Sequence, residues 1–372
     1  MASNKNLSQI LNQATQILRT GNKAQAVEYL SNFCSTQPHN AALPRDIGIF
    51  FQQNNMPLKA EMFYRHSLSL DNSQAAIHFN LGVIYQNMGR TEQAIQAYLD
   101  AVEAQPDYAR AFANLGYLYH ESGNSEKCRE CCQNAQRLEP DNPQIKHMIA
   151  ALGVDPLPEA ADQQYIKNLY KEYAGHYDKH LSVTLKSRVP ELIHNATLKH
   201  LKQTPSNSAL LDLGCGTGVC GQLFSQYTHN MIGVDLSEEM IEEARKKDIY
   251  QQLYASDIDE YLNKTIASHS DEKYDIIISS DVLIYIGNLK NIIEGAFRAL
   301  NRGGLFSFSI ESSIDSCDDF TLDATGRYKH NPQYISRISS ESSFSILSSA
   351  ETELREQNRQ PVTGRIYVLG KP

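Results

Sequence analysis

The chain has 372 residues, which corresponds to two or three domains at roughly 150 residues per domain. Hydrophobic residues make up 41% of it and charged residues 21%, which is typical of a folded protein and excludes a disordered one. The formal net charge of −9 and the lack of a basic run disfavour a nucleic-acid partner. No apolar stretch approaches the ~18 residues of a membrane span, and the first residues lack the apolar core of a signal peptide. We therefore expect no membrane partner and a cytoplasmic location.

A period of 34 residues runs through the first part of the chain. Small residues stand where two helices of a hairpin would touch, a large apolar residue stands one turn later, and proline closes the second helix. The period predicts four helix hairpins and a capping helix, at 7–40, 41–74, 75–108, 109–142 and 144–152. The eight columns shared by the third and fourth units are Leu81 and Leu115, Gly82 and Gly116, Tyr85 and Tyr119, Gly89 and Gly123, Ala94 and Cys128, Tyr98 and Cys132, Ala101 and Ala135, and Pro106 and Pro140.

This spacing resembles the tetratricopeptide repeat over roughly residues 7–142. The resemblance implies an all-α superhelix whose concave face binds a protein partner, as an extended peptide or a helix. Cys128, Cys131 and Cys132 have a spacing that invites a metal interpretation, but two of them occupy packing columns and no His pair stands near them. We therefore expect reduced, buried cysteines and no metal site.

The composition changes after the repeats. Gly153-Val154-Asp155-Pro156-Leu157-Pro158 interrupts helical continuity, so we place a linker at 153–162, between a repeat domain at 1–152 and a second domain at 163–372. From about residue 205, short apolar runs alternate with helical stretches, which predicts an α/β domain with a parallel sheet. The expected strands are Ala209–Leu213, Met231–Val234, Leu253–Ala255, Asp275–Ser279 and Leu305–Ile310, followed by a hairpin of Ser343–Glu353 and Thr363–Leu369. The expected helices are Ser237–Lys247, Asn288–Leu300 and Gln333–Ser340.

The first strand leads into Asp212-Leu213-Gly214-Cys215-Gly216-Thr217-Gly218. A strand followed by glycines and a helix lets backbone amides approach a ligand closely. The glycines also satisfy a dinucleotide fingerprint, which is weak evidence by itself. Asp212 stands where a carboxylate would meet a cation, Asp235 where it would accept both hydroxyls of a ribose, and Asp257 where it could accept from an adenine amino group. An aliphatic ammonium, a ribose and an adenine without a phosphate describe S-adenosylmethionine.

Residues 165–372 resemble the class I methyltransferases that use S-adenosylmethionine, through the glycine-rich motif, Gly233-Val234-Asp235-Leu236-Ser237 and Gly303-Gly304-Leu305. The resemblance implies a Rossmann-like, seven-stranded sheet of order 3-2-1-4-5-7-6 with strand 7 antiparallel. The pairing with repeats resembles predicted bacterial methyltransferases with amino-terminal tetratricopeptide repeats, which share a lead-in like Tyr173–Leu181. In related small-molecule methyltransferases, such as those of ubiquinone and biotin synthesis, this lead-in helix closes over the cofactor, so the resemblance implies that Tyr173 and Tyr177 are lid residues. The expected cofactor-binding residues are Asp212, Gly214, Cys215, Gly216, Gly218, Asp235, Leu236, Asp257, Ile258, Asp281, Tyr173 and Tyr177.

The acceptor side should follow the fourth and fifth strands, because ligands of open sheets bind at the carboxyl ends of strands. That rule indicates Asp281, Tyr285, Glu311 and a loop at Gly326–Tyr334. Within this loop, His330 is a candidate general base or substrate-binding residue because imidazole titrates near neutral pH; its alternative is an exposed loop histidine. We therefore expect Asp281, Tyr285 and His330 to be the catalytic residues.

Together these features predict an S-adenosylmethionine-dependent methyltransferase whose repeats mediate a protein interaction. Its acceptor is a protein or a small molecule, since the residues do not distinguish the two. The first alternative is a catalytically inert repeat adaptor. A methyltransferase for small molecules, with repeats used only for docking, is the second alternative, and a dinucleotide oxidoreductase is the third.

Overall fold

The computed structural model describes residues 2–171, 174–201, 208–228, 230–265, 273–313, 317–357 and 360–372. They form two compact units, Met1–Ile145 and Lys146–Pro372, and the expected order of helical repeats followed by an α/β domain is confirmed. The division falls within α9 (Pro143–Ala151), the helix expected to cap the repeats. Among the described residues, every helix is too short or too polar to cross a bilayer.

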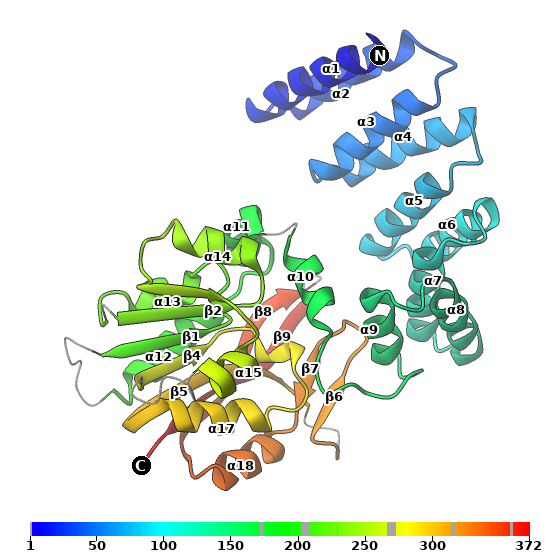
Figure 1. Cartoon of the computed structure of the whole chain (residues 1–372). Coiled ribbons are helices and arrows are strands. Elements are labelled where there is room, and N and C mark those ends of the chain that lie inside the picture. The colour runs from blue at the N-terminus through cyan, green and yellow to red at the C-terminus, as the bar shows by residue number, and fades with distance from the viewer. Residues whose placement is uncertain are drawn as a thin grey trace. The chain divides into compact units, whose positions relative to one another are not determined.

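The first unit is a row of four helix hairpins (Figure 1). Each hairpin coincides with one of the 34-residue units, because the small and large columns of the repeat place the two helices in contact. The helices are α1 (Ala2–Arg19), α2 (Lys23–Ser35), α3 (Ala42–Gln53), α4 (Pro57–Leu70), α5 (Ala75–Asn87), α6 (Thr91–Ala104), α7 (Ala109–Glu121) and α8 (Ser125–Leu138).

Glycine stands where the helices of a hairpin approach each other most closely. In the third hairpin, a Cβ on Gly82 would overlap the ring of Tyr98. The buried hydroxyl of Tyr98 donates to Gln86 Oε1 at 2.8 Å and accepts from Asn114 Nδ2 of the next hairpin at 3.0 Å. The repeat therefore specifies both the helix contact and the partners of its buried polar group. In the fourth hairpin the tyrosine is replaced by Cys132, which is buried like the neighbouring cysteines of α8.

The second unit is built on a nine-stranded sheet (Figure 1). Strands β3, β2, β1, β4 and β5 are parallel, β9 runs antiparallel to β5, and β8 pairs with β9. These seven strands have the expected order. The strands are β1 (Ala209–Leu213), β2 (Asn230–Asp235), β3 (Gln252–Ala255), β4 (Tyr274–Ser279), β5 (Leu300–Ser312), β6 (Phe320–Leu322), β7 (Tyr328–His330), β8 (Ser345–Gln357) and β9 (Gln360–Gly370).

The two additional strands are β6 and β7, which form an antiparallel ribbon. Strand β7 pairs with the carboxyl end of β5, through Glu311 opposite Lys329 and Ser312 opposite His330. The expectation of a loop at Gly326–Tyr334 is therefore wrong. The long β5 continues beyond its pairing with β4, which ends at Phe308, and the ribbon covers the edge that this leaves.

Alternate residues of the central strands enter two separate cores, as a sheet covered on both faces requires. Leu210 and Ile276 pack on one face with α12 and α13, whereas Leu211 and Ile277 pack on the other with α15, α17 and α18. The helices are α10 (Gln163–Lys171), α11 (Tyr177–Lys179), α12 (Val189–Leu198), α13 (Val219–Phe224), α14 (Glu238–Arg245), α15 (Ile258–Glu260), α17 (Lys290–Ala299) and α18 (Pro332–Glu341). The shorter or irregular turns are η1 (Ala174–His176), η2 (His180–Thr184), η3 (Tyr261–Thr265) and η4 (Leu283–Tyr285).

Candidate functional site

A cavity of about 260 Å³ lies at the carboxyl ends of the parallel strands, where open α/β sheets bind their ligands. It is lined by residues that follow β1, β2, β3 and β4, together with residues of α10, α11 and η4. Nine of the residues expected from the sequence share this cavity: Gly214, Gly216, Asp235, Leu236, Asp257, Ile258, Asp281, Tyr177 and Tyr285.

The glycine turn after β1 forms one wall of the cavity. Gly214, Gly216 and Gly218 have φ angles of +71°, +54° and +87°, which lie in the left-handed region that favours glycine. A Cβ on Gly214 would also overlap the side chain of Val282. Only glycine therefore gives this turn its shape and leaves its backbone open to the cavity.

Two carboxylates stand at the ends of the next strands. Asp235 follows from β2, and its two oxygens accept from Gly216 N at 2.8 Å and Ser237 N at 2.9 Å. Burial raises the pKa of Asp235, while the backbone hydrogen bonds oppose the rise. Asp257 Oδ1 accepts from the first amides of α15, those of Asp259 and Glu260. Each carboxylate oxygen has two lone pairs, so both groups keep acceptor capacity toward the cavity.

Asp212 does not line the cavity, contrary to the expectation that it meets a cation there. It is fully buried, and its Oδ2 accepts from the Tyr250 hydroxyl at 2.7 Å. Among the described residues its Oδ1 has no hydrogen-bond partner. Burial raises the pKa of Asp212 to about 7. A Cβ on Gly221 would lie 3.0 Å from Oδ2, so Asp212 supports the start of α13 behind the glycine turn.

Two other expected cofactor residues also lie beside the cavity instead of in its wall. Gly218 packs against Tyr250, whose Cε2 would be 3.0 Å from an added Cβ. Cys215 lines a small adjoining hollow of about 30 Å³, which shares Gly214 and Asp281 with the cavity. Gly218 therefore shapes the turn, and Cys215 lines the hollow.

His330 is not brought to the cavity. It is fully buried, with Nε2 at 2.8 Å from the carbonyl oxygen of Ile286 and 3.1 Å from that of Gly287. Burial lowers the pKa of His330 to about 4, which keeps the ring neutral. This corrects the expectation of a general base or an exposed loop histidine, because pairing of β7 with β5 carries His330 into the interior. Its geometry fits a role in holding the segment after η4.

Of the two expected lid residues, Tyr173 lies outside the described residues. Tyr177 begins α11 and lines the cavity. The next residue, Asp178, accepts a hydrogen bond from Thr217 and pairs with Lys247 Nζ at 2.9 Å. These contacts hold α11 against the glycine turn.

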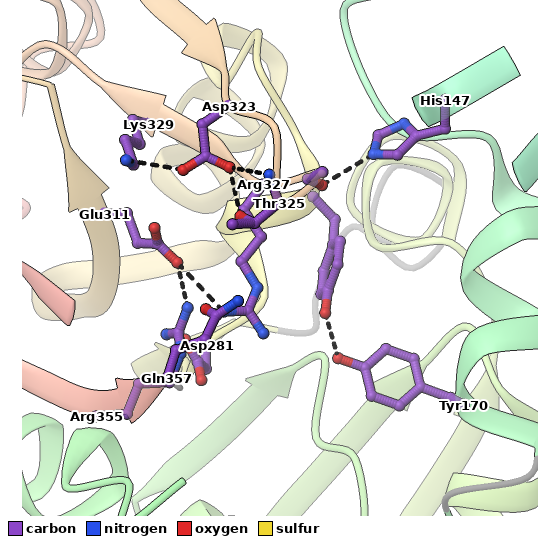
Figure 2. A network of polar contacts seen from close by, with 12 residues as sticks. His147, Tyr170, Asp281, Glu311, Asp323, Thr325, Arg327, Lys329, Arg355 and Gln357 are labelled. Atoms are coloured by element: carbon purple, nitrogen blue, oxygen red, sulfur yellow. Dashed lines mark hydrogen bonds and ion pairs between the residues drawn. The ribbon is translucent and has the colours of Figure 1, made fainter. Parts of the chain in front are cut away.

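The structure adds two residues that sequence reasoning missed (Figure 2). Tyr170 of α10 has its hydroxyl 2.8 Å from that of Tyr285. Arg355 of β8 is fully buried, with Nη1 2.6 Å from Asp281 Oδ1 and Nη2 bonded to Glu311 Oε1. Glu311 is consequently held by the arginine and does not line the cavity. Arg355 is remote in sequence from both carboxylates, so no local signal indicated it.

Asp281 combines an unusual backbone with this ion pair. Its φ of +61° places it in the left-handed region, which non-glycine residues seldom occupy. Non-glycine residues with this backbone conformation cluster at functional sites. Its amide donates to Ser309 Oγ at 2.9 Å. The backbone contact and the Arg355 pair together fix the Asp281 carboxylate at the cavity wall.

The segment expected to be a linker forms another part of the wall. The carbonyl oxygen of Glu159 accepts from Gly287 N at 2.8 Å and Asn288 N at 2.9 Å, and Ala161 N donates to the Tyr285 carbonyl at 2.9 Å. Glu159, Ala160 and Ala161 all line the cavity. This segment therefore contributes to the site as well as connecting the chain.

Comparisons with known proteins agree with this architecture. A family model described as "Methyltransferase domain" matches residues 205–355. Models described as tetratricopeptide or TPR repeats match 63–96, 87–123 and 109–142.

Curated relatives match over part of the chain only. An uncharacterized protein of Haemophilus influenzae is 32% identical over 34% of this chain and 51% of its own length. A ubiquinone biosynthesis O-methyltransferase of Hydrogenovibrio crunogenus is 29% identical over 32% of this chain and 49% of its own. The chain thus spans about half the length of these curated relatives.

A solved structure of magnesium protoporphyrin IX methyltransferase from Synechocystis, with bound S-adenosylmethionine, is 17% identical with a TM-score of 0.41. That similarity covers 58% of this chain and 100% of the other. From the family-model matches, the chain combines tetratricopeptide repeats with a methyltransferase domain.

Proposed function

We propose that the protein is an S-adenosylmethionine-dependent methyltransferase. The observation that carries the proposal is the convergence of the glycine turn, Asp235, Asp257 and Asp281 on one cavity at the carboxyl ends of β1 to β4. We assign the catalytic role to 163–372 and the binding of a partner to the repeats of 1–152. Residues 153–162 contribute a wall of the site in addition to joining the two.

The residues of the cavity fit this cofactor. Backbone at Gly214 and Gly216 lies open to a ligand, since a Cβ on Gly216 would meet only Tyr177 Cε1, at 3.9 Å. Asp235 retains lone pairs for the two ribose hydroxyls, and Asp257 retains lone pairs for an adenine amino group. Leu236 and Ile258, beside these carboxylates, provide apolar contacts for the adenine ring.

The cofactor supplies an electrophilic methyl group, and this chain's residues position the acceptor for in-line attack. Holding reacting atoms ~3–3.5 Å apart is worth several kcal/mol of barrier. Asp281 and Tyr285 are the polar residues at the acceptor end that we propose to contact the acceptor. Tyr177 lines the cavity near Gly216, and we propose that its ring limits access of water to the bound cofactor.

Calorimetric titration of the full-length protein with S-adenosylhomocysteine tests the proposal, with NADH as the comparison ligand. Asp235→Ala should weaken binding at least about tenfold, because hydrogen bonds to a charged acceptor are lost. Glu353→Ala, which removes an exposed carboxylate of β8 outside the cavity, should bind normally. Absence of binding to the unchanged protein would leave the inert adaptor, and binding of NADH instead would indicate an oxidoreductase.

We also infer that the repeats recruit a protein, as the acceptor or as a scaffold. The matches to tetratricopeptide-repeat models support this role. Incubation of the full-length protein with a cell extract and methyl-labelled cofactor distinguishes the two forms. Label in the protein fraction would support a protein acceptor, whereas label confined to small molecules would favour docking repeats.

A further inference from the structure

Three tyrosines surround the acceptor end of the cavity. The ring of Tyr170 lies between those of Tyr177 and Tyr285, with centroids 6.0 Å away in each case and interplanar angles of 70° and 87°. All three residues line the cavity. The hydrogen bond between the hydroxyls of Tyr170 and Tyr285 fixes two of the rings. Rings at nearly right angles form a preorganised aromatic corner.

The charge of the cavity wall has one sign. Carboxylates from the ends of β2, β3 and β4 and from the 159–161 segment line it, and among its described lining residues there is no lysine, arginine or histidine. Two arginines stand outside this lining: Arg355 engages Oδ1 of Asp281, and Arg327 lies close enough to Asp281 and Tyr285 to interact with both electrostatically. The structure shows no hydrogen bond to Asp281 Oδ2 from another described residue. Asp281 therefore presents one fixed, charged acceptor atom beside the tyrosines.

We propose that the acceptor is an amine, which enters as an ammonium ion and is bound by the tyrosine corner and Asp281; this inference rests on the proposed methyltransferase function. Aromatic faces attract ammonium groups, and a carboxylate forms a charge-assisted hydrogen bond with them. A carboxylate or phenolate acceptor would find no cationic side chain among the described residues that line this wall.

The transfer step follows from this arrangement. The bound ammonium gives one proton to Asp281, which passes it to solvent, and the freed nitrogen lone pair forms the new N–C bond to the methyl group. The C–S bond breaks, and its electron pair stays on sulfur. The products are a methylated ammonium ion and S-adenosylhomocysteine, so atoms and charge balance.

Ligand-observed NMR titration of the full-length protein, saturated with S-adenosylhomocysteine, tests the inference. The probes are n-butylammonium and n-butyrate, which have similar chains and opposite charge. We expect the ammonium to bind about tenfold tighter or more. Equal binding of the two probes, including no binding of either, would overturn the amine proposal. Failure of S-adenosylhomocysteine itself to bind would instead refute the proposed function.

Variants separate the two contributions. Asp281→Asn should weaken binding of butylammonium about tenfold, whereas Glu353→Gln should leave it unchanged. Tyr285→Phe keeps the ring and should retain most of the affinity, but Tyr285→Leu should lose it. Binding of S-adenosylhomocysteine reports that each variant is folded. Equal affinities of the Phe and Leu variants would overturn the role of the ring.

Discussion

At the scale of single residues, the site depends on which way a strand-end carboxylate faces. Asp235 ends β2 and Asp212 is the last but one residue of the neighbouring parallel strand β1, yet Asp235 enters the cavity and Asp212 is buried against Tyr250. Burial removes the water around the Asp212 carboxylate and raises its pKa to about 7. Asp235 is therefore placed to contact a ligand, whereas Asp212 affects the stability of the fold.

The raised pKa of Asp212 predicts a pH-dependent effect of Asp212→Asn. An unfolded aspartate has a pKa of about 3.9, so between about pH 4 and 7 the folded state binds more protons and this group's contribution to stability falls as pH rises. Asn is neutral and still accepts from Tyr250. The melting temperature of Asp212→Asn, relative to the unchanged protein, should therefore rise from pH 4.5 to 7.5. A constant difference over that range would contradict the buried, protonated Asp212.

The buried Arg355 predicts a large loss of stability on Arg355→Met. The substitution removes the cation of Asp281 and leaves the buried Glu311 only the more distant Arg327, whose Nη1 is 3.9 Å from Oε1. Breaking a buried ion pair costs about 3–5 kcal/mol. Arg365→Met is the matched control, because Arg365 on the adjacent β9 pairs with the half-exposed Glu351; surface pairs contribute about 0–1 kcal/mol. Denaturant unfolding measures the free energy of unfolding of both variants. Equal losses would show that the buried Arg355 pair stabilises the protein no more than the Arg365 pair does.

At the scale of elements, the same column of the repeat carries different packing in successive hairpins. Gly82 faces the ring of Tyr98, whereas Gly116 faces Cys132 Sγ, 3.1 Å from an added Cβ. A sulfur at that distance needs to move by only a few tenths of an ångström, but the tyrosine ring is held by two hydrogen bonds. Cys132 therefore leaves more room for a side chain at position 116 than Tyr98 leaves at position 82.

This contrast predicts unequal effects of Gly82→Ala and Gly116→Ala. The first should destabilise the repeats by about 1–3 kcal/mol through overpacking, since the ring and both its hydrogen bonds must shift. The second should cost less, because only Cys132 Sγ must move by a few tenths of an ångström; the helix preference of alanine, up to about 1 kcal/mol, applies to both variants. Thermal or denaturant unfolding of the full-length variants measures the difference, and a larger loss at Gly116 would contradict this packing.

The β6–β7 ribbon is the element that the sequence pattern did not indicate. Its strands have three residues each, too few to show a period of two. Strand β7 lies within the expected loop at Gly326–Tyr334 and contains His330, which was expected to be catalytic. Pairing with β5 turns His330 inward. His330, a polar residue near Tyr328 and Tyr334, is therefore buried because its strand covers a free edge of β5.

At the scale of the whole molecule, two cores of different kinds occur in one chain. The repeats bury small and aromatic residues between helices, and the second unit buries aliphatic and aromatic residues on both faces of a sheet. The boundary between the two units lies between Ile145 and Lys146. Each unit therefore has the means to unfold cooperatively by itself.

Two unfolding transitions are therefore expected in calorimetry of the full-length protein. S-adenosylhomocysteine at 100 times its dissociation constant should stabilise the second unit by about 2.7 kcal/mol and leave the repeat transition in place. Gly82→Ala should lower the repeat transition alone. A single transition that both changes shift together would show that the two units unfold as one.

Local signals in the sequence determined most of the elements and most of the residues expected on the cofactor side of the cavity. The 34-residue period, the glycines that need a positive φ and Asp235 at a strand end act through neighbours a few residues away, so they can be read from the chain directly. The tertiary structure alone decided that Asp212 faces away from the cavity, that His330 is buried, and that Arg355 holds Asp281. These outcomes depend on strand register and long-range pairing, in which a shift of one residue turns a side chain to the opposite face of the sheet.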